Sequence, residues 1–391
     1  MSTMNLFVMA SMPILKVLLI TAIGSFLALD RVNILGENAR KHLNKVVFFV
    51  FGPALVASNL AKAVTFETFL TLWFMPINIF ITYLIGSITW VDTCQSYKSS
   101  KAFQRPNNRI MFCSFSDCGV LIGSLGKLPI IIVPAMCNEK GSPFGAVDVC
   151  HSYAMAYASL SMALNGIFIW SYTYNIIRIS SKEIVEEVDQ TSPNREPLLP
   201  SQNSQTPLSS KLQQFLTTFP RKINFKAFLA PSAIGVIIGF MIGMISPLRN
   251  LLIGNDAPLH VVQDSAYMLG DAAIPAITLI LGANLLPGLK GSQIQVRTII
   301  CIAVVRYILL PLLGLVIVRG AVHVGILHVD PLFQFILLLQ YALPPAMSIR
   351  TMTQVFGSGQ SEYSVILLWT YGLAAVSLTL WSTFFLWLVV S

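Results

Sequence analysis

Apolar segments long enough to cross a membrane recur along almost the whole chain, with short polar connections between them. A helix needs about 20 predominantly apolar residues to span a hydrocarbon core of about 30 Å. Soluble domains would not repeat such segments from one end of a chain to the other. The pattern therefore predicts an all-α membrane protein with ten transmembrane helices, over residues 6–28, 43–61, 68–91, 110–135, 148–176, 226–247, 263–285, 297–318, 331–353 and 362–390.

The composition agrees with this assignment. Of the 391 residues, 55% are hydrophobic and 11% are charged, against about 25% charged in ordinary soluble domains. The formal net charge is +8, but the cations are confined to the connections and form no basic surface interleaved with aromatic residues. Nucleic acid is therefore excluded as a partner, and the lipid bilayer is the expected surrounding.

The six cysteines form no C-x-x-C pair and have no histidine at zinc-ligand spacing, so neither a metal nor another cofactor is expected. Cys137 and Cys150 bracket the short connection after the fourth span. They could form a disulfide in an oxidising compartment, but free, packed thiols are the favoured interpretation.

Cations are concentrated in the connections after the first, third, fifth and seventh spans. These are Arg31, Arg40, Lys41, Lys45, Lys98, Lys101, Arg105, Arg109, Arg178, Lys182, Arg195, Lys211, Arg221, Lys222, Lys226, Lys290 and Arg297. The opposite side carries only Lys62, Lys140, Arg249 and Arg319. Because positive connections stay on the cytosolic side, both termini are predicted to face the lumen or the cell exterior.

One connection, 177–225, is long, polar and rich in Ser, Gln and Pro, which is typical of a disordered linker. It is predicted to be cytosolic and to tether two membrane halves, residues 1–176 and 226–391, although a regulatory role is also open. Each half then contains five spans. An odd number of spans makes the second half enter the membrane with the opposite orientation, so any repeat between the halves must be inverted.

Prolines occur at corresponding places in the two halves. Pro13 of the first span matches Pro231 of the sixth, and Leu128-Pro129 of the fourth span matches Leu343-Pro344 of the ninth at nearly the same spacing. The agreement in order and spacing favours an internal repeat. Inverted repeats of this kind are typical of secondary transporters.

The candidate chemistry lies where glycines and prolines interrupt the fourth and ninth spans. Proline removes a helical hydrogen bond, so both helices should break there, and the new half-helix N-termini present partial positive charge to a shared site at the middle of the membrane. Lys127 and Arg350 add full charges, which favours an anionic ligand. The predicted binding residues are Ser124, Lys127, Pro129, Pro344, Pro345, Ser348, Arg350, Asn59 and Asn284.

Each of these assignments has a plainer alternative. Lys127 and Arg350 could reach a water surface and only snorkel, and Ser124 and Ser348 could be small residues at helix contacts. Asn59 and Asn284 could bond between helices rather than to a ligand. The pattern alone leaves these alternatives open.

Asp271 and Arg306 could form a structural pair between the seventh and eighth spans, or an acid could carry protons for coupled transport; the structural pair is favoured. An intramembrane aspartyl protease is the rival class, suggested by Asp117, by Asp271 and by the triplet Pro53-Ala54-Leu55. Such enzymes need two facing aspartates, and their Pro-Ala-Leu motif follows both, whereas here it precedes both. The sequence therefore favours a carrier over an enzyme.

Two motifs, Leu128-Pro129-Ile130-Ile131-Ile132-Val133-Pro134-Ala135 and Gln340-Tyr341-Ala342-Leu343-Pro344-Pro345-Ala346-Met347, carry a resemblance to a known family. Together with Cys137 to Gly145 they resemble the plant PIN-LIKES family of auxin carriers of the endoplasmic reticulum, related to the PIN auxin efflux carriers. The similarity covers nearly the whole chain. It implies a five-plus-five inverted fold, with spans one, two, six and seven as a scaffold and a transport domain that carries the crossed helices four and nine.

The resemblance implies that auxin, or a similar small organic anion, is bound at this crossover and stored in the lumen, which would control auxin signalling. The chain departs from the family where asparagines are expected. Ser124 and Lys127 replace two of them in the fourth span, and Ser348 replaces one in the ninth, followed by Arg350. A non-transporting anion-binding regulator and a carrier of another organic anion therefore stay open, as does the oligomeric state, a homodimer included.

Overall fold

The computed structural model describes residues 3–64, 72–98, 128–139, 141–173, 231–254, 256–286, 288, 296–327, 330–346, 349 and 360–390. These residues form helices joined by short connections, and no β-strand occurs among them. Five helical segments are long and apolar enough to cross a membrane, and a bent pair adds a sixth. The prediction of an all-helical membrane protein is confirmed, whereas several of the ten predicted spans lie partly outside the described residues.

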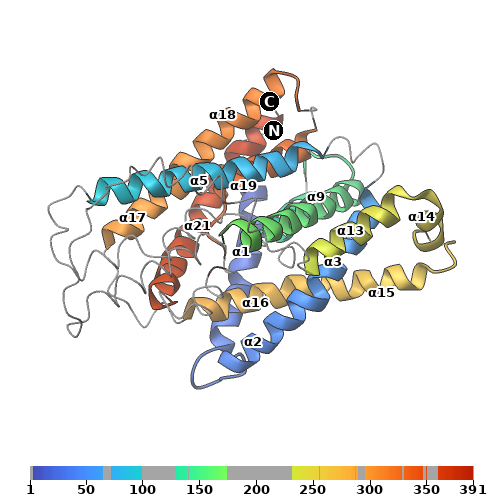
Figure 1. Ribbon diagram of the computed structural model, residues 1–391, viewed down its shortest axis with the longest axis horizontal. Helices are drawn as coiled ribbons and strands as arrows, with labels where there is room; N and C mark the ends of the chain where they lie inside the picture. The colour runs from blue at the N-terminus through green and yellow to red at the C-terminus, as the bar shows by residue number, and fades with distance from the viewer. Residues whose placement is uncertain are drawn as a thin grey trace, which may run out of the picture.

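Among the described residues, the first half contains four long helical segments and one short helix. Its elements are α1 (Thr3–Leu27), then α2 (Glu37–Val46), η1 (Val47–Phe51) and α3 (Gly52–Ala63) in one continuous run, α5 (Phe74–Lys98), the short α8 (Pro129–Cys137), and α9 (Val147–Phe168), which continues into η3 (Ile169–Thr173). In Figure 1, α5 overlaps α19 in projection, and it contacts both α9 and α19.

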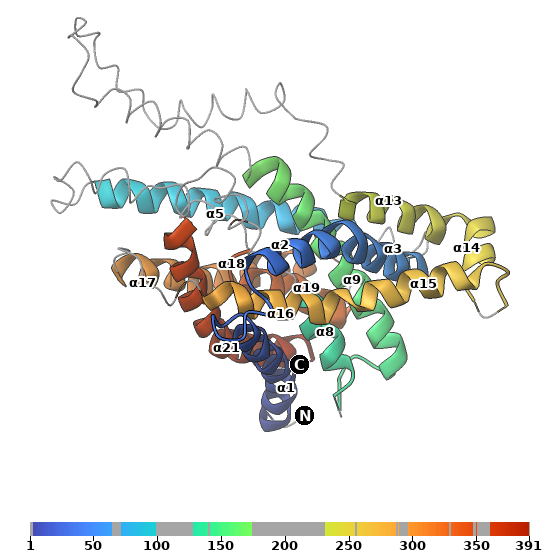
Figure 2. The same cartoon turned by 90° about the horizontal axis from the view of Figure 1, so that it is seen from below.

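The second half likewise contains both continuous helices and helices interrupted by short breaks. Its elements are α13 (Pro231–Met244), α14 (Ser246–Leu252), α15 (His260–Asp271), α16 (Ala273–Leu285), α17 (Val296–Val304), η6 (Val305–Leu309), α18 (Leu310–His323), α19 (Pro331–Ala342) and α21 (Gln360–Val390). The two chain ends lie near each other in both views (Figures 1 and 2). An even number of membrane crossings would bring them to the same side.

Two π-helical turns come directly before prolines. η1 precedes Gly52-Pro53 and η6 precedes Leu310-Pro311. Proline lacks an N–H group and pushes against the carbonyl of the preceding turn, so the helix widens there instead of breaking. The backbone N–H of Gly52 accordingly donates to Val47 O, and that of Leu310 donates to Val305 O.

Four spans pack into one unit, the scaffold group, which consists of α1, α2–η1–α3, α13–α14 and α15–α16. The closest pairings are α13 with α3 and α1 with α16. Glycines make them close: Cβ atoms added at Gly235 and Gly239 would meet Pro53 O at 2.7 Å and Ala57 O at 2.9 Å. A Cβ atom at Gly282 would overlap Thr21 O. The helices of this group therefore meet backbone against backbone.

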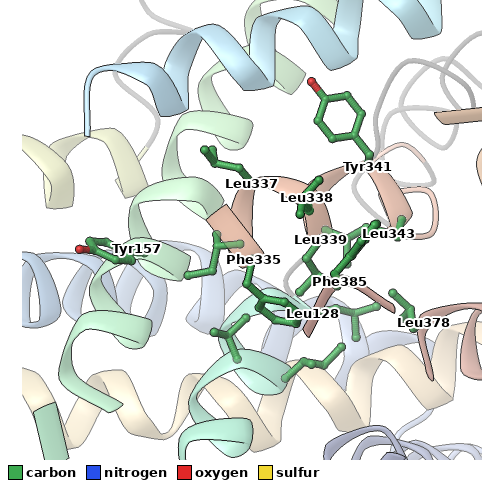
Figure 3. Packing of buried hydrophobic residues seen from close by; sticks show 14 of the residues in the cluster. Leu128, Tyr157, Phe335, Leu337, Leu338, Leu339, Tyr341, Leu343, Leu378 and Phe385 are labelled. Carbon is green, nitrogen blue, oxygen red and sulfur yellow. The ribbon is translucent and has the colours of Figure 1, made fainter. Parts of the chain in front are cut away.

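The other elements form the crossover group: α5, α8, α9–η3, α17–η6–α18, α19 and α21. Helix α19 lies at its centre, in contact with α18, α21, α9, α5 and α8. Its residues 335–339 are at most 1% exposed, and Figure 3 shows their side chains within the main hydrophobic cluster. A helix that is apolar on all sides is a buried helix, and α19 is the buried centre of this group.

Candidate functional site

The helix of the ninth span stops in the protein interior. α19 ends at Ala342, and residues 343–346 are not helical. Leu343 adopts an extended conformation, with φ −76° and ψ 147°. Leu343 is fully buried and Ala346 is 2% exposed. The interruption therefore falls at Pro344 and Pro345, where the sequence places it, because neither proline can donate the N–H that would continue the helix.

Two tyrosines of α21 bind the backbone of this interruption, which we call the span-nine break (residues 343–346). The Tyr371 hydroxyl donates to Pro345 O at 3.1 Å, and the Tyr363 hydroxyl donates to Ala346 O at 2.6 Å. Both tyrosines are buried. A carbonyl without a hydrogen-bond partner at membrane depth costs roughly several kcal/mol of free energy, because no water can reach it. The two phenols remove that cost.

The described residues cover only the second half of the predicted fourth span. α8 begins at Pro129, the position at which a proline is best tolerated in a helix. The Leu128 carbonyl accepts hydrogen bonds from the backbone N–H groups of Ile131 and Ile132, both at 3.0 Å. Leu128 also belongs to the hydrophobic cluster around α19 (Figure 3). The start of α8 and the body of α19 thus share one core.

A buried polar network crosses the group beside the span-nine break. The Gln340 side chain accepts a hydrogen bond from Asn78 Nδ2 at 2.7 Å and donates to Ser161 Oγ at 2.9 Å. The Tyr341 hydroxyl donates to Asn78 Oδ1 at 2.9 Å. These residues come from α5, α9 and α19, and all four are buried. The network fixes α19 relative to two neighbouring spans, since each amide is satisfied in this arrangement.

The sequence analysis did not assign Asn78, Ser161, Tyr363 or Tyr371 to the site. A signal was present, because amides and hydroxyls in the middle of an apolar span need partners. The partners come from spans far apart in sequence, however, and no local spacing connects them. Gln340 lies in one of the motifs that carry the resemblance, but its partners are evident only in the tertiary structure.

Asn59 and Asn284 are engaged within the scaffold group. Asn59 is 5% exposed and its Nδ2 donates to Leu55 O in the same helix at 2.8 Å. Asn284 Oδ1 accepts from Arg40 Nη1 at 3.5 Å, and the same nitrogen donates to Ala283 O at 2.6 Å. The bond of Asn284 joins two helices, whereas that of Asn59 stays within α3, and a ligand contact by either amide stays a prediction.

The four predicted ligand residues with the most direct chemistry, Ser124, Lys127, Ser348 and Arg350, lie outside the described residues. Pro129, Pro344 and Pro345 are described: Pro129 is the first residue of α8, and Pro344 and Pro345 lie just beyond the last residue of α19. The described part of the crossover is thus its proline-shaped backbone and the side chains that hold it.

The Asp271–Arg306 pair is not formed. Asp271 lies at the exposed end of α15, with His151 near enough for an electrostatic interaction. Arg306 is fully buried in η6 and interacts with Tyr83, Tyr307, Tyr363 and Tyr371. The two ion pairs within 4 Å among the described residues are Lys16–Glu139 and Lys41–Glu37. The prediction was wrong because α15 packs against α3 and α14, away from the tyrosines around Arg306.

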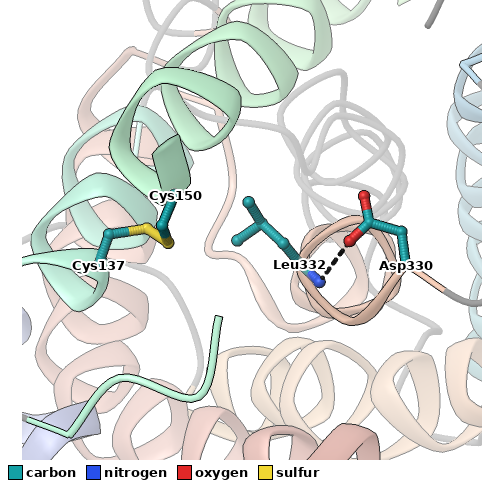
Figure 4. Close-up of a disulfide and its surroundings, with 4 residues drawn as sticks. All are labelled: Cys137, Cys150, Asp330 and Leu332. Atoms are coloured by element: carbon teal, nitrogen blue, oxygen red, sulfur yellow. Dashed lines mark hydrogen bonds between the residues drawn. A yellow bond between two sulfur atoms is a disulfide. The ribbon is translucent and has the colours of Figure 1, made fainter. Parts of the chain in front are cut away.

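Cys137 and Cys150 form a disulfide, contrary to the favoured expectation of free thiols. Their Cα atoms are 5.6 Å apart, within the range that a disulfide requires. Figure 4 shows the bond joining the end of α8 to the first turn of α9, and the Asp330 carboxylate accepting from the Leu332 N–H at 3.0 Å at the start of α19. The thiols meet because the connection folds α8 back along α9, a pairing that the sequence spacing alone did not decide.

One ion pair crosses between the two groups. Lys16 Nζ of α1 lies 2.6 Å from Glu139 Oε1, which follows α8 by two residues. The two side chains are 58% and 24% exposed. This contact was not expected from the sequence, in which Lys16 lies within the first predicted span and Glu139 in the connection after the fourth.

The family and the relatives that this chain resembles match it over nearly its whole length. The chain matches a family model described as a membrane transport protein over residues 9–382. It is 45% identical to Protein PIN-LIKES 3 of Arabidopsis thaliana over 99% of each chain. It is 47% identical to Protein PIN-LIKES 1 of the same plant, over 100% of this chain and 81% of that protein. An uncharacterized transporter of Saccharomyces cerevisiae is 21% identical, over 94% of this chain and 92% of that one.

Proposed function

Because the chain belongs to the PIN-LIKES family of membrane transport proteins, we propose that it is a secondary carrier of auxin (indole-3-acetic acid) or of a similar small organic anion. The membrane is that of the endoplasmic reticulum. Movement of the anion into the lumen lowers the auxin that is available for signalling in the cytosol. The class of transporter follows from the family, whereas the substrate and the membrane are proposals that come from the resemblance described above.

The observation that carries the proposal is the span-nine break. A helix interrupted at membrane depth is tolerated only inside protein or beside a watery cavity, and this one is buried. The half-helix that follows a break presents free N–H groups and partial positive charge at its start. An anion is the ligand that such a terminus stabilises. In this proposal Ser124, Lys127, Ser348 and Arg350 complete the site and attract the carboxylate.

The scaffold group supports the inverted repeat. If spans one and six correspond, and spans two and seven, then the pairing of α1 with α16 and that of α13 with α3 are the same contact made twice. Two arginines repeat the relation. Arg40, before α3, donates to Ala283 O at the end of α16. Arg249, before α15, donates to Val64 O and Lys62 O at the end of α3.

The interface between the two groups supports alternating access. It includes an apolar cluster formed by Val47, Leu55, Ala273, Ile277 and Ile280 of the scaffold group with Ile130, Met155 and Ala158 of the crossover group. Apolar contacts have no directional requirement, so they can be exchanged during a sliding motion. In the proposal the crossover group, with the bound anion, moves against the scaffold group and opens to one side at a time.

The disulfide supports the predicted orientation. Disulfides persist in oxidising compartments such as the lumen of the endoplasmic reticulum and are rare in the cytosol. Cys137 and Cys150 flank the connection after the fourth span, which the charge distribution places in the lumen. Both termini would then be lumenal and the 177–225 linker cytosolic, a placement that rests on two independent signals.

The test is uptake of radiolabelled indole-3-acetic acid into vesicles of endoplasmic reticulum that contain the protein. We expect saturable uptake, and we expect it to change in a variant with Lys127→Asn and Arg350→Gly, which introduces the residues expected for the family. Lys45→Asn, which removes an exposed cation of α2, is the matched control and should leave uptake unchanged.

The alternative that the sequence leaves open is a regulator that binds the anion without moving it, because three of the expected asparagines are replaced. Binding of the labelled anion to purified protein without uptake into vesicles would support this alternative. Neither binding nor uptake by the wild-type protein, with uptake regained in the double variant, would indicate that this chain carries a different organic anion.

A further inference from the structure

We infer that Tyr363 and Tyr371, with Arg306 behind them, are positioning residues that hold the span-nine break in the shape required for anion binding. The inference rests on the proposed function for its substrate, and on the hydrogen bonds of α21 for its geometry. We call these three residues the tyrosine clamp.

The first step is the requirement for a clamp. Pro344 and Pro345 remove two consecutive backbone donors, so the carbonyl groups around them lose the partners that a continuous helix supplies. Extended backbone between buried side chains can adopt several conformations unless other bonds select one. Tyr371 and Tyr363 bind successive carbonyls, those of Pro345 and Ala346. Two successive carbonyls fixed in direction define the conformation of the backbone at Pro345 and Ala346.

The second step concerns the support on which the tyrosines stand. Both belong to α21, a helix of 31 residues that contains no proline. Tyr307 of η6 donates its hydroxyl to Thr370 O at 2.6 Å, and Trp381 Nε1 of α21 donates to Tyr307 O at 2.8 Å. The eighth span is thus bonded to α21 on both sides of Tyr371. The clamp is attached to two spans and not to a loop.

The third step is the role of Arg306. Its guanidinium is fully buried and interacts electrostatically with the phenols of Tyr307, Tyr363 and Tyr371. Each of these hydroxyls donates its own proton to a carbonyl. A phenol oxygen whose O–H donates a hydrogen bond to a carbonyl can still accept one, whereas a guanidinium group can only donate hydrogen bonds. Arg306 therefore favours the orientation in which the phenol protons point toward the backbone.

Together these contacts fix the direction of the backbone within the span-nine break, beside which the proposed function places the anion. A free N–H group stabilises an anion strongly only when it is aimed at the position that the anion occupies. Loss of a clamp bond should therefore weaken anion binding, while the apolar packing of the aromatic rings is retained. The expected signature is a higher half-saturating concentration, with protein amount and maximal rate little changed.

The experiment compares Tyr371→Phe and Tyr363→Phe with Tyr157→Phe in the vesicle uptake assay. Tyr157 is the matched control, because its hydroxyl also bonds to the ninth span but at the opposite end, donating to Asp330 Oδ2 at 3.1 Å. We expect the half-saturating concentration to rise about fivefold to tenfold in each clamp variant, the equivalent of one lost buried hydrogen bond. Tyr157→Phe should leave it unchanged. Arg306→Lys should have a smaller effect than Arg306→Met.

Hydrogen exchange of the purified proteins separates this inference from the proposed function. Tyr371→Phe should speed exchange of the backbone amides that follow Pro345, and Tyr157→Phe should not. If the wild-type protein takes up no auxin, the proposed substrate is wrong, and exchange still tests the clamp. If uptake is saturable and both clamp variants match the wild type in half-saturation and in exchange, the clamp is overturned.

Discussion

The scaffold group and the crossover group are held together by different means. In the scaffold group, glycines bring helices so close that backbone meets backbone, and arginines bind the carbonyls at helix ends. In the crossover group, buried amides and phenols bind one another and the broken backbone. The first arrangement leaves no room for adjustment, whereas the second keeps an interrupted helix ordered.

The side-chain hydrogen bonds named above stay inside one group or the other, with the bond of Lys16 to Glu139 as the exception. Between the groups the described contacts are otherwise largely apolar. In the proposed mechanism, each group moves as a unit. The comparison suggests that a carrier of this fold places directional bonds within its moving parts and non-directional contacts between them.

The greatest loss of stability should come from a substitution at the closest helix contact of the scaffold group. Gly282→Leu forces a side chain into the Thr21 carbonyl, and overpacking of this kind costs about 1–3 kcal/mol or more when the backbone cannot shift. We expect the melting transition of the purified protein to be lost. Gly320→Ala is the control, because nothing lies within 4 Å of its added Cβ atom. Equal melting temperatures in both variants would show that close approach is not what holds this group.

The next largest loss of stability should follow removal of the disulfide in the crossover group. Cys137→Ser with Cys150→Ser should lower the free energy of unfolding by about 2–4 kcal/mol, because the disulfide closes a short loop of chain. Cys301→Ser, which changes the free cysteine of α17, should leave stability nearly unchanged. Mass shifts with a maleimide reagent before and after reduction report the disulfide directly. Two reactive thiols at 137 and 150 without reduction would contradict it.

A third effect weakens the polar network without touching the scaffold group. Gln340→Leu removes one hydrogen-bond partner from Asn78 and one from Ser161, at a cost of about 1–3 kcal/mol. Thermal unfolding should show this loss, and addition of Ser161→Ala should restore part of it, because the buried hydroxyl that lost its partner is then removed as well. If the double variant were as unstable as the sum of the two single variants, the network would not act as one unit.

The smallest effect concerns the bond between the groups. Lys16→Gln or Glu139→Gln should change stability by less than about 1 kcal/mol, since partly exposed ion pairs contribute little and are screened by salt. The exchanged pair, Lys16→Glu with Glu139→Lys, should behave like the wild type in uptake. A rate that rises in the single variants and returns in the exchanged pair would sharpen the comparison, because it would mean that this bond slows the motion of one group against the other.

The sequence predicted the elements that depend on local chemistry. The length of the apolar segments predicted the helices, and Pro344 and Pro345 predicted the end of α19. A proline interrupts the helix locally, because its missing N–H group removes a hydrogen bond of that same turn. The same reasoning failed for Asp271 and Arg306. Opposite charges in neighbouring spans suggested a pair, but which side of a helix faces which neighbour depends on the packing of the whole bundle.

The membrane class and the helices can therefore be predicted from the amino-acid sequence, because each follows from the free energy of a single segment in lipid. The packing of the helices was needed to see that Cys137 meets Cys150, that Arg40 and Arg249 bind carbonyls at the ends of α16 and α3, and that α21 supplies the phenols for the span-nine break. These contacts join residues distant in sequence. Their energies depend on distances of a few ångströms, which no local pattern of residues contains.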